Sequence, residues 1–153
     1  MLVVELQTQQ AIEHITRGLS QFEKNNAIRE GLNEAAKIFE AYGRVNYVDR
    51  LEGKYSTGQT LRSFRVRVNM GRHSDGEPMS ATGFARDTGY KAHWIDLGTE
   101  DRYYTTKRGK KKYVGRMKAN YFFDDARAEG ERPAMDAIYD GIQRAIDSIK
   151  NGR

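Results

Sequence analysis

A chain of 153 residues is long enough for one domain with its own hydrophobic core, and we expect a single domain over residues 1–153. The absence of cysteine excludes disulfide bonds and thiolate metal sites, and no apolar run in the sequence is long enough to span a membrane. The net charge of +5 is concentrated in one segment, and the first ten residues lack the pattern of a signal peptide, so we expect a soluble protein that stays where it is made.

The first fifty residues predict a short strand followed by two amphipathic helices. Residues 2–6 are β-branched and apolar, as in a strand. After Thr8, a candidate N-cap, apolar residues recur at helical spacing as far as Lys24, and "KNN" predicts a break there. The second helix is expected to end near Gly43. The two helices form either a hairpin or one kinked helix.

Three consecutive strands are predicted in the middle of the chain. Residues 61–70 alternate between apolar and polar or basic side chains, as in a strand with one buried face. Residues 79–85 predict a weaker strand, and residues 90–97, "YKAHWIDL", a stronger one. The short connections between them indicate an antiparallel meander.

The last third of the chain predicts a long basic loop, 102–118, and then a helix. Residues 121–126, "YFFDDA", form a short apolar-to-acidic patch, and Pro133 suits the first turn of a final helix with an apolar face. The resulting fold class is α+β: an antiparallel meander packed against N-terminal helices and a C-terminal helix, with the basic loop outside.

No catalytic or metal-binding group of residues stands out in the sequence. His14, His73 and His93 are far apart, and no serine or threonine lies in a nucleophile motif. Asp124 and Asp125 are adjacent, and on a strand such neighbours would point to opposite faces. We therefore expect no enzyme activity, no metal and no cofactor.

The stretch "AHWIDLGT" combines a strand pattern with an abrupt end. Gly98 permits the positive φ that ends a strand sharply, and Thr99 can form local hydrogen bonds in the turn. Asp96 shares one face of the expected strand with Trp94, and a carboxylate that is even half buried there needs a partner. We predict that this partner is Arg62.

The basic segment 102–118 holds eight lysines and arginines and no acid, which leaves the other 136 residues with a net charge of −3. It permits three interpretations: a solvated mobile loop, a nucleic-acid contact with tyrosines for stacking, or an arm that docks on a protein. We favour a protein with an acidic face, because aromatic side chains anchor protein interfaces and charges set their register. The candidate interaction residues are Arg102, Tyr103, Tyr104, Lys107, Arg108, Lys110, Lys111, Lys112, Tyr113, Arg116 and Lys118.

Three separated pieces resemble a known family. "TGQTLRSF" is similar to a "TG-x-LR-x-S" stretch, "AHWIDLGT" to an "A-x-(aromatic)-x-E-x-GT" stretch, and "NYFFDDA" to a "PF-x-x-PA" entry into the last helix. In this order they resemble the neck, or tail-completion, proteins that join head and tail in long-tailed bacteriophages. The residues that carry the resemblance are Thr57, Gly58, Leu61, Arg62, Ser63, Trp94, Asp96, Gly98, Thr99, Phe122 and Ala126.

The resemblance implies a structural role in the virion. Family members form a ring, expected here to hold six copies, between the portal or stopper complex and the tail tube, and genome DNA passes through the lumen. The chain would be assembled in the bacterial cytoplasm and would not contact a membrane. Two other functions stay open: a tail terminator of the same region, and a small basic nucleic-acid-binding or ribonuclease module.

Overall fold

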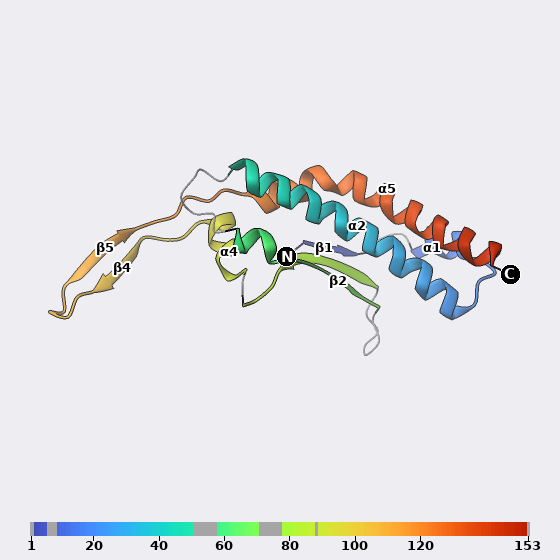
Figure 1. The fold of residues 1–153 in the computed structure, drawn as a ribbon, viewed down its shortest axis with the longest axis horizontal. Helices are drawn as coiled ribbons and strands as arrows, with labels where there is room; N and C mark the ends of the chain where they lie inside the picture. Colours follow the sequence, from blue (N-terminus) through green and yellow to red (C-terminus); the bar gives the residue numbers. More distant parts are fainter. Residues whose placement is uncertain (1, 6–8, 51–57, 71–77, 88, 153) are drawn as a thin grey trace.

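The structure is a computed structural model that describes residues 2–5, 9–50, 58–70, 78–87 and 89–152. The predicted α+β class is confirmed: two long helices pack along each other above a small antiparallel sheet, and a separate hairpin extends from one end (Figure 1). The elements in chain order are β1 (Leu2–Glu5), α1 (Gln9–Ile15), α2 (Gln21–Arg50), α3 (Gln59–Arg62), β2 (Phe64–Asn69), β3 (Met79–Phe84), α4 (Tyr90–Leu97), β4 (Arg102–Thr105), β5 (Lys111–Gly115) and α5 (Phe122–Asn151).

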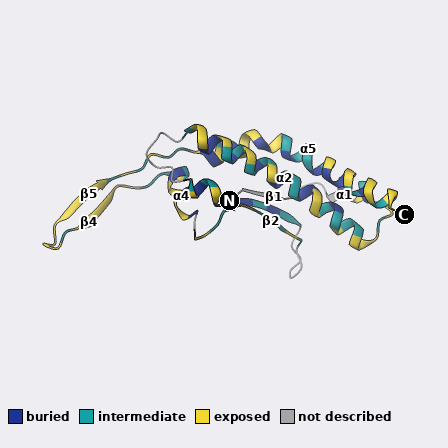
Figure 2. Ribbon diagram, viewed as in Figure 1, coloured by how far each residue is buried: buried dark blue, intermediate teal, exposed yellow. Residues whose placement is uncertain are grey.

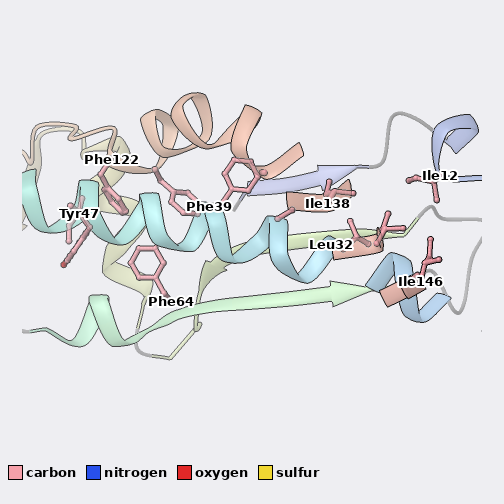
Figure 3. Close-up of a cluster of buried hydrophobic side chains, with 14 residues drawn as sticks. Ile12, Leu32, Phe39, Tyr47, Phe64, Phe122, Ile138 and Ile146 are labelled. Carbon is pink, nitrogen blue, oxygen red and sulfur yellow. The ribbon is translucent and has the colours of Figure 1, made fainter. Parts of the chain in front are cut away.

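Helices α2 and α5 run antiparallel and supply most of the core (Figures 1 and 3). They approach each other most closely at two glycines. A Cβ on Gly31 would lie 2.6 Å from the carbonyl oxygen of Ile138, and a Cβ on Gly141 would lie 2.8 Å from the Cα of Gly31. Backbone therefore packs on backbone at this crossing, and Leu32 and Ile142 are fully buried beside it.

Strand β3 is the centre of a three-stranded antiparallel sheet in the order β1–β3–β2. Helix α2 covers one face of this sheet, where the Thr82 hydroxyl donates a 2.8 Å hydrogen bond to the carbonyl of Ala36. Val66 is the cross-strand partner of Thr82 and shares that face. Arg65 and Arg67 therefore lie on the opposite face, which neither α2 nor α5 covers.

An aromatic cluster fills the core at the end of the molecule from which the hairpin extends. Its members are Tyr47, Phe64, Phe84, Phe122 and Phe123. The rings of Tyr47 and Phe122 meet edge to face at 5.1 Å, and those of Phe64 and Phe84 lie 4.4 Å apart. The cluster joins α2, the sheet and the first turn of α5 into one core (Figure 3).

The predicted break between the first two helices was placed wrongly. Helix α1 ends at Ile15, and Gly18 turns the chain with a φ of 86°. Helix α2 begins at Gln21 behind a capping box: the Glu23 carboxylate accepts from the Ser20 amide at 2.8 Å, and the Glu23 amide donates to the Ser20 hydroxyl at 3.4 Å. Thr8, the predicted N-cap, lies outside the described residues.

Gly43 predicted the end of a helix and Pro133 the start of another, and the structure has neither boundary. Gly43 is buried inside α2, where a Cβ would approach the Phe64 ring to 2.9 Å, so it serves packing. Helix α5 begins at Phe122 and runs through Pro133. Its buried stripe continues on both sides of the proline, from Ala126 to Ile138, and this packing holds the helix together where a backbone hydrogen bond is lost.

Residues 90–97 form helix α4, so the prediction of a third meander strand was wrong. Ala92 and Ile95 are the buried residues of this helix, three positions apart, as a helix requires. The third strand of the sheet is β1, which pairs with β3 from the N-terminal side. In the part of the chain that the structure describes, no helix is both long and apolar enough to cross a membrane.

Candidate interaction site

The basic segment is a β-hairpin, which corrects the prediction of a loop. Strands β4 and β5 pair antiparallel, with Tyr103 opposite Tyr113 and Thr105 opposite Lys111. The tip is closed by a hydrogen bond from the Thr106 amide to the Lys110 carbonyl at 2.9 Å. Gly109 supplies the positive φ, 76°, that this turn needs.

Both faces of this hairpin are open to solvent. The two tyrosine rings opposite each other, Tyr103 and Tyr113, pack at 5.4 Å, yet each side chain is more than half exposed. Tyr104 and Val114 are also about half exposed. Figure 2 shows exposed residues along both strands, away from the body. A two-stranded hairpin is marginally stable alone, so this geometry favours a partner that covers one face.

Among the described residues, the cations of the hairpin have no ion-pair partner. None of the ion pairs formed by these residues includes a lysine or arginine of segment 102–118. At the base of the hairpin, the Asp101 carboxylate accepts a 3.1 Å hydrogen bond from the Tyr113 hydroxyl. This bond raises the pKa of Tyr113. Within the described part of the chain, Lys107, Arg108 and Lys110 therefore present positive charge that no ion pair neutralises.

The two chains at the root of the hairpin are held together by backbone and hydroxyl hydrogen bonds. The Thr99 amide donates to the carbonyl of Met117 at 3.0 Å, and the Met117 amide donates to the Thr99 hydroxyl at 2.9 Å. Gly98 has a φ of 74° and a ψ of −170°, a conformation nearly restricted to glycine. A Cβ there would also lie 2.7 Å from the amide nitrogen of Ala119. The Gly-Thr pair thus fixes where the two chains of the hairpin leave the body.

Asp96 joins this root to helix α5. Its side-chain oxygen accepts a 2.9 Å hydrogen bond from the Phe123 amide, and its backbone carbonyl accepts from the amides of Asn120 and Tyr121. Asp96 therefore caps the first turn of α5 from another element. Burial raises the pKa of the Asp96 carboxyl, and the hydrogen bond from Phe123 opposes that effect.

The predicted pairing of Asp96 with Arg62 was wrong. Arg62 is exposed at the end of α3, and no ion pair or hydrogen bond links it to Asp96. The other described residues of that motif shape the turn before β2. Gly58 has a φ of 67°, Leu61 accepts a 2.7 Å hydrogen bond from Arg44, and the buried Ser63 hydroxyl donates to the Thr60 carbonyl at 2.6 Å. Thr57 lies outside the described residues.

Phe122 and Ala126 are fully buried in the first turns of α5. Arg50, at the C-terminus of α2, forms an ion pair with Asp125 and donates to the Asn120 carbonyl at 3.1 Å. The second and third motifs therefore meet at one region, the root of the hairpin and the start of α5, while the first shapes the turn before β2. Trp94 is an exception, because its side chain is 43% exposed on the outer face of α4.

A second site, which the sequence reasoning missed, is a groove of about 650 Å³ between the uncovered face of the sheet and α4. Arg65, Arg67 and Arg86 line it, together with His93 and Tyr90. The alternation in residues 61–70 had indicated only a strand with one buried face. The groove forms because α4 stands beside the sheet, and that arrangement depends on the helix that was predicted as a strand.

The histidines and paired aspartates of the sequence are not gathered at one place among the described residues. No three His, Asp or Glu side chains among them gather closely enough to hold a metal ion. His14 and His93 lie on separate helices, and His73 is outside the described residues. Asp124 and Asp125 begin α5, where Asp125 is paired with Arg50. The arrangement at the hairpin and groove is suited to binding.

Comparison with known proteins returned no match: no family model, no curated protein and no solved structure matches this chain.

Proposed function

We propose that the chain is a structural virion protein that forms a ring of six copies at the head–tail junction of a tailed phage. In this role it joins the portal or stopper complex to the tail tube, and its lumen passes genome DNA during ejection. The support is the resemblance of three motifs to neck proteins, together with their position in the fold. Asp96 bonds to the start of α5, Thr99 bonds to the second chain of the hairpin root, and Phe122 and Ala126 are buried where α5 begins.

The observation that carries this proposal is the hairpin itself. It extends from the body as two exposed strands (Figure 2). Tyrosines are exposed on both strands, and the cations at its tip have no ion-pair partner among the described residues. A rigid root with an open arm suits a component whose arm is covered on assembly. The acceptor is an acidic surface of a neighbouring subunit or of an adjacent ring, because Lys107 to Lys112 must be neutralised when they are brought close to other arms.

Neutralising the tip tests this function. Lys110, Lys111 and Lys112 are exposed and have no ion-pair partner among the described residues, so changing all three to Gln should leave the melting temperature unchanged. In a phage that carries this triple variant, filled heads and complete tails should accumulate separately, as counted by electron microscopy. The control is the triple variant Arg17→Gln, Arg29→Gln and Lys150→Gln, which removes the same number of exposed positive charges near the other end of the body and leaves the arm intact.

The same experiment separates the proposal from its main alternative. Eight cations with exposed tyrosines would also suit a nucleic-acid-binding or ribonuclease module. If the triple variant joins heads to tails normally, and the wild-type protein binds DNA tightly with a steep salt dependence, that alternative replaces the docking role. A tail terminator would occupy the same virion region. The position of the ring relative to the tail tube distinguishes a tail terminator from a neck protein.

A further inference from the structure

The groove beside α4 is a concave surface lined by three arginines. Its floor is the uncovered face of the sheet, where β3 contributes Ala81 and Gly83. These small residues leave the floor low, so a bulky element can approach it closely. Arg67 and Arg86 stand at its rim, and neither forms an ion pair among the described residues.

An apolar stripe lies next to this groove on α4. Tyr90 and Trp94 pack edge to face at 5.7 Å, and both remain about half exposed. Leu97, one turn further along, is 49% exposed. Aromatic side chains beside arginines are typical of the centre of a protein interface. The groove offers positive charge and the stripe offers apolar side chains, so together they suit a helix that has an acidic face.

Such a helix face exists on the far side of the same chain. Asp136, Asp140 and Asp147 are exposed on α5, at spacings of four and seven residues. With 3.6 residues per turn, these spacings place the three side chains along one line about 16 Å long. We call this line the acidic ridge. None of the three forms an ion pair among the described residues.

The acidic ridge and the groove face opposite ways. The buried residues of α5, such as Ala134, Ile138 and Ile142, point to α2, and the ridge lies on the other side of the helix. Helix α2 packs in turn on the sheet, whose far face is the groove floor. Figure 1 shows α5 and the sheet on opposite sides of α2. The acidic ridge of one copy therefore cannot bind in the groove of the same copy.

We infer that the groove of one copy receives the acidic ridge of α5 from a second copy, in a head-to-tail contact. Two different surfaces that meet in this way build a closed ring or an open filament, unlike a two-fold contact that stops at a dimer. This inference rests on the proposed ring and names the surfaces that would form it. The arginine rim pairs with the ridge carboxylates, and Tyr90 and Trp94 pack against the flank of the helix.

The hairpin is a poorer partner for the ridge. The ridge is convex and the hairpin projects as a convex arm, whereas the groove is concave and can enclose a helix face. The hairpin is left free to contact another protein. Nucleic acid is the other anion that three arginines could bind, and the experiment below detects it.

The test is a charge swap with the full chain. One variant reverses the groove, Arg67→Glu with Arg86→Glu, and the other reverses the ridge, Asp136→Lys with Asp140→Lys. Sedimentation velocity at low salt should show that each variant alone associates at least about tenfold more weakly than the wild type. An equimolar mixture should regain assembly, because each reversed surface then meets its complement on the other variant.

Several results would overturn this inference. They are a wild type that stays monomeric at high concentration, single variants that associate as well as the wild type, and a mixture that fails to regain assembly. If the variant with Lys110, Lys111 and Lys112 changed to Gln no longer self-associates, the hairpin and not the groove is the partner of the ridge. Loss of binding to a fluorescent DNA duplex in the groove variant, with self-association intact, would assign the groove to nucleic acid.

Two further measurements keep the result interpretable. Circular dichroism melting shows whether each variant is folded, and the milder pair Arg67→Gln with Arg86→Gln should weaken association to an intermediate degree. If the charge swap has no effect but the protein forms a ring in purified virions, only these two surfaces are rejected. The proposed function then still stands.

Discussion

At the residue scale, Asp96 shows how one side chain can serve two elements. It ends α4 and caps α5, so its acceptor oxygen matters more than its charge. We predict that Asp96→Ala lowers the free energy of unfolding by about 1–2 kcal/mol, because the buried Phe123 amide loses its partner. Asp96→Asn retains an oxygen acceptor and should be close to neutral at pH 7. Urea denaturation of both variants checks this, and equal losses would contradict the capping role.

The pH dependence of Asp96 has a definite sign. Burial raises its folded-state pKa above the unfolded value, so the folded state binds the proton more tightly. This group therefore adds stability as the pH falls from the folded pKa toward the unfolded one, and that contribution is absent above the folded pKa. Asp96→Asn should remove this contribution, so the wild type should gain stability relative to the variant as the pH is lowered through that window.

Gly98 is the second decisive residue, because both its backbone angles and its surroundings exclude a side chain. Gly98→Ala should destabilise the fold by about 2–3 kcal/mol through the strained φ and the clash with the 117–119 segment. Gly109 is a matched control: its φ is 76°, but a Cβ would meet nothing within 4 Å. Gly109→Ala should cost less, about 1–2 kcal/mol, because only the strained φ remains. Similar thermal shifts in the two variants would show that the contact at the root is unimportant.

At the element scale, the crossing of α2 and α5 depends on two glycines in contact. Gly141→Ala should lower the free energy of unfolding by about 2–3 kcal/mol, because a Cβ at 2.8 Å from Gly31 forces the helices apart. Asp140→Ala, on the exposed side of the same turn, should change it by less than about 0.5 kcal/mol. A Gly141→Ala protein as stable as the wild type would mean that the helices can separate without loss of packing.

Several elements could be predicted from sequence, and others could not, for identifiable reasons. The alternation in β2 and the apolar stripe at the C-terminal end of α5 were visible because each has one buried face. Helix α4 was mistaken for a strand because Tyr90, Trp94 and Leu97 are exposed, so its apolar residues do not mark its buried side. The Ser20-x-x-Glu23 capping box was a signal for the start of α2 that the spacing of apolar residues concealed.

The interaction residues show the same contrast. The hairpin residues were identified from charge alone, but their strand structure was not, because a hairpin with no core shows no apolar alternation. The partner of Asp96 could not be predicted, since it is a backbone amide contributed by a segment 27 positions away. The groove was missed because it is built from β2, β3 and α4, and no local pattern marks it.

At the scale of the whole molecule, charge and shape are distributed unevenly. The hairpin carries the excess positive charge away from a body that is mildly acidic overall, and the root holds it there through backbone contacts that salt does not screen. A partner that covers the hairpin would bury its tyrosines and neutralise its tip at the same time. Free protein should therefore behave as a stable body with an uncovered arm.

The central claim, that the hairpin is a docking arm of a neck ring, is tested most directly by a cryo-electron microscopy reconstruction of the head–tail junction in virions of the phage that encodes this chain. We predict six copies around the channel, with each hairpin ordered against an acidic surface of a neighbouring subunit or ring. Tyr103 and Tyr113 should be covered there. Hairpins that project free into the lumen, or a junction that lacks the protein, would contradict the account.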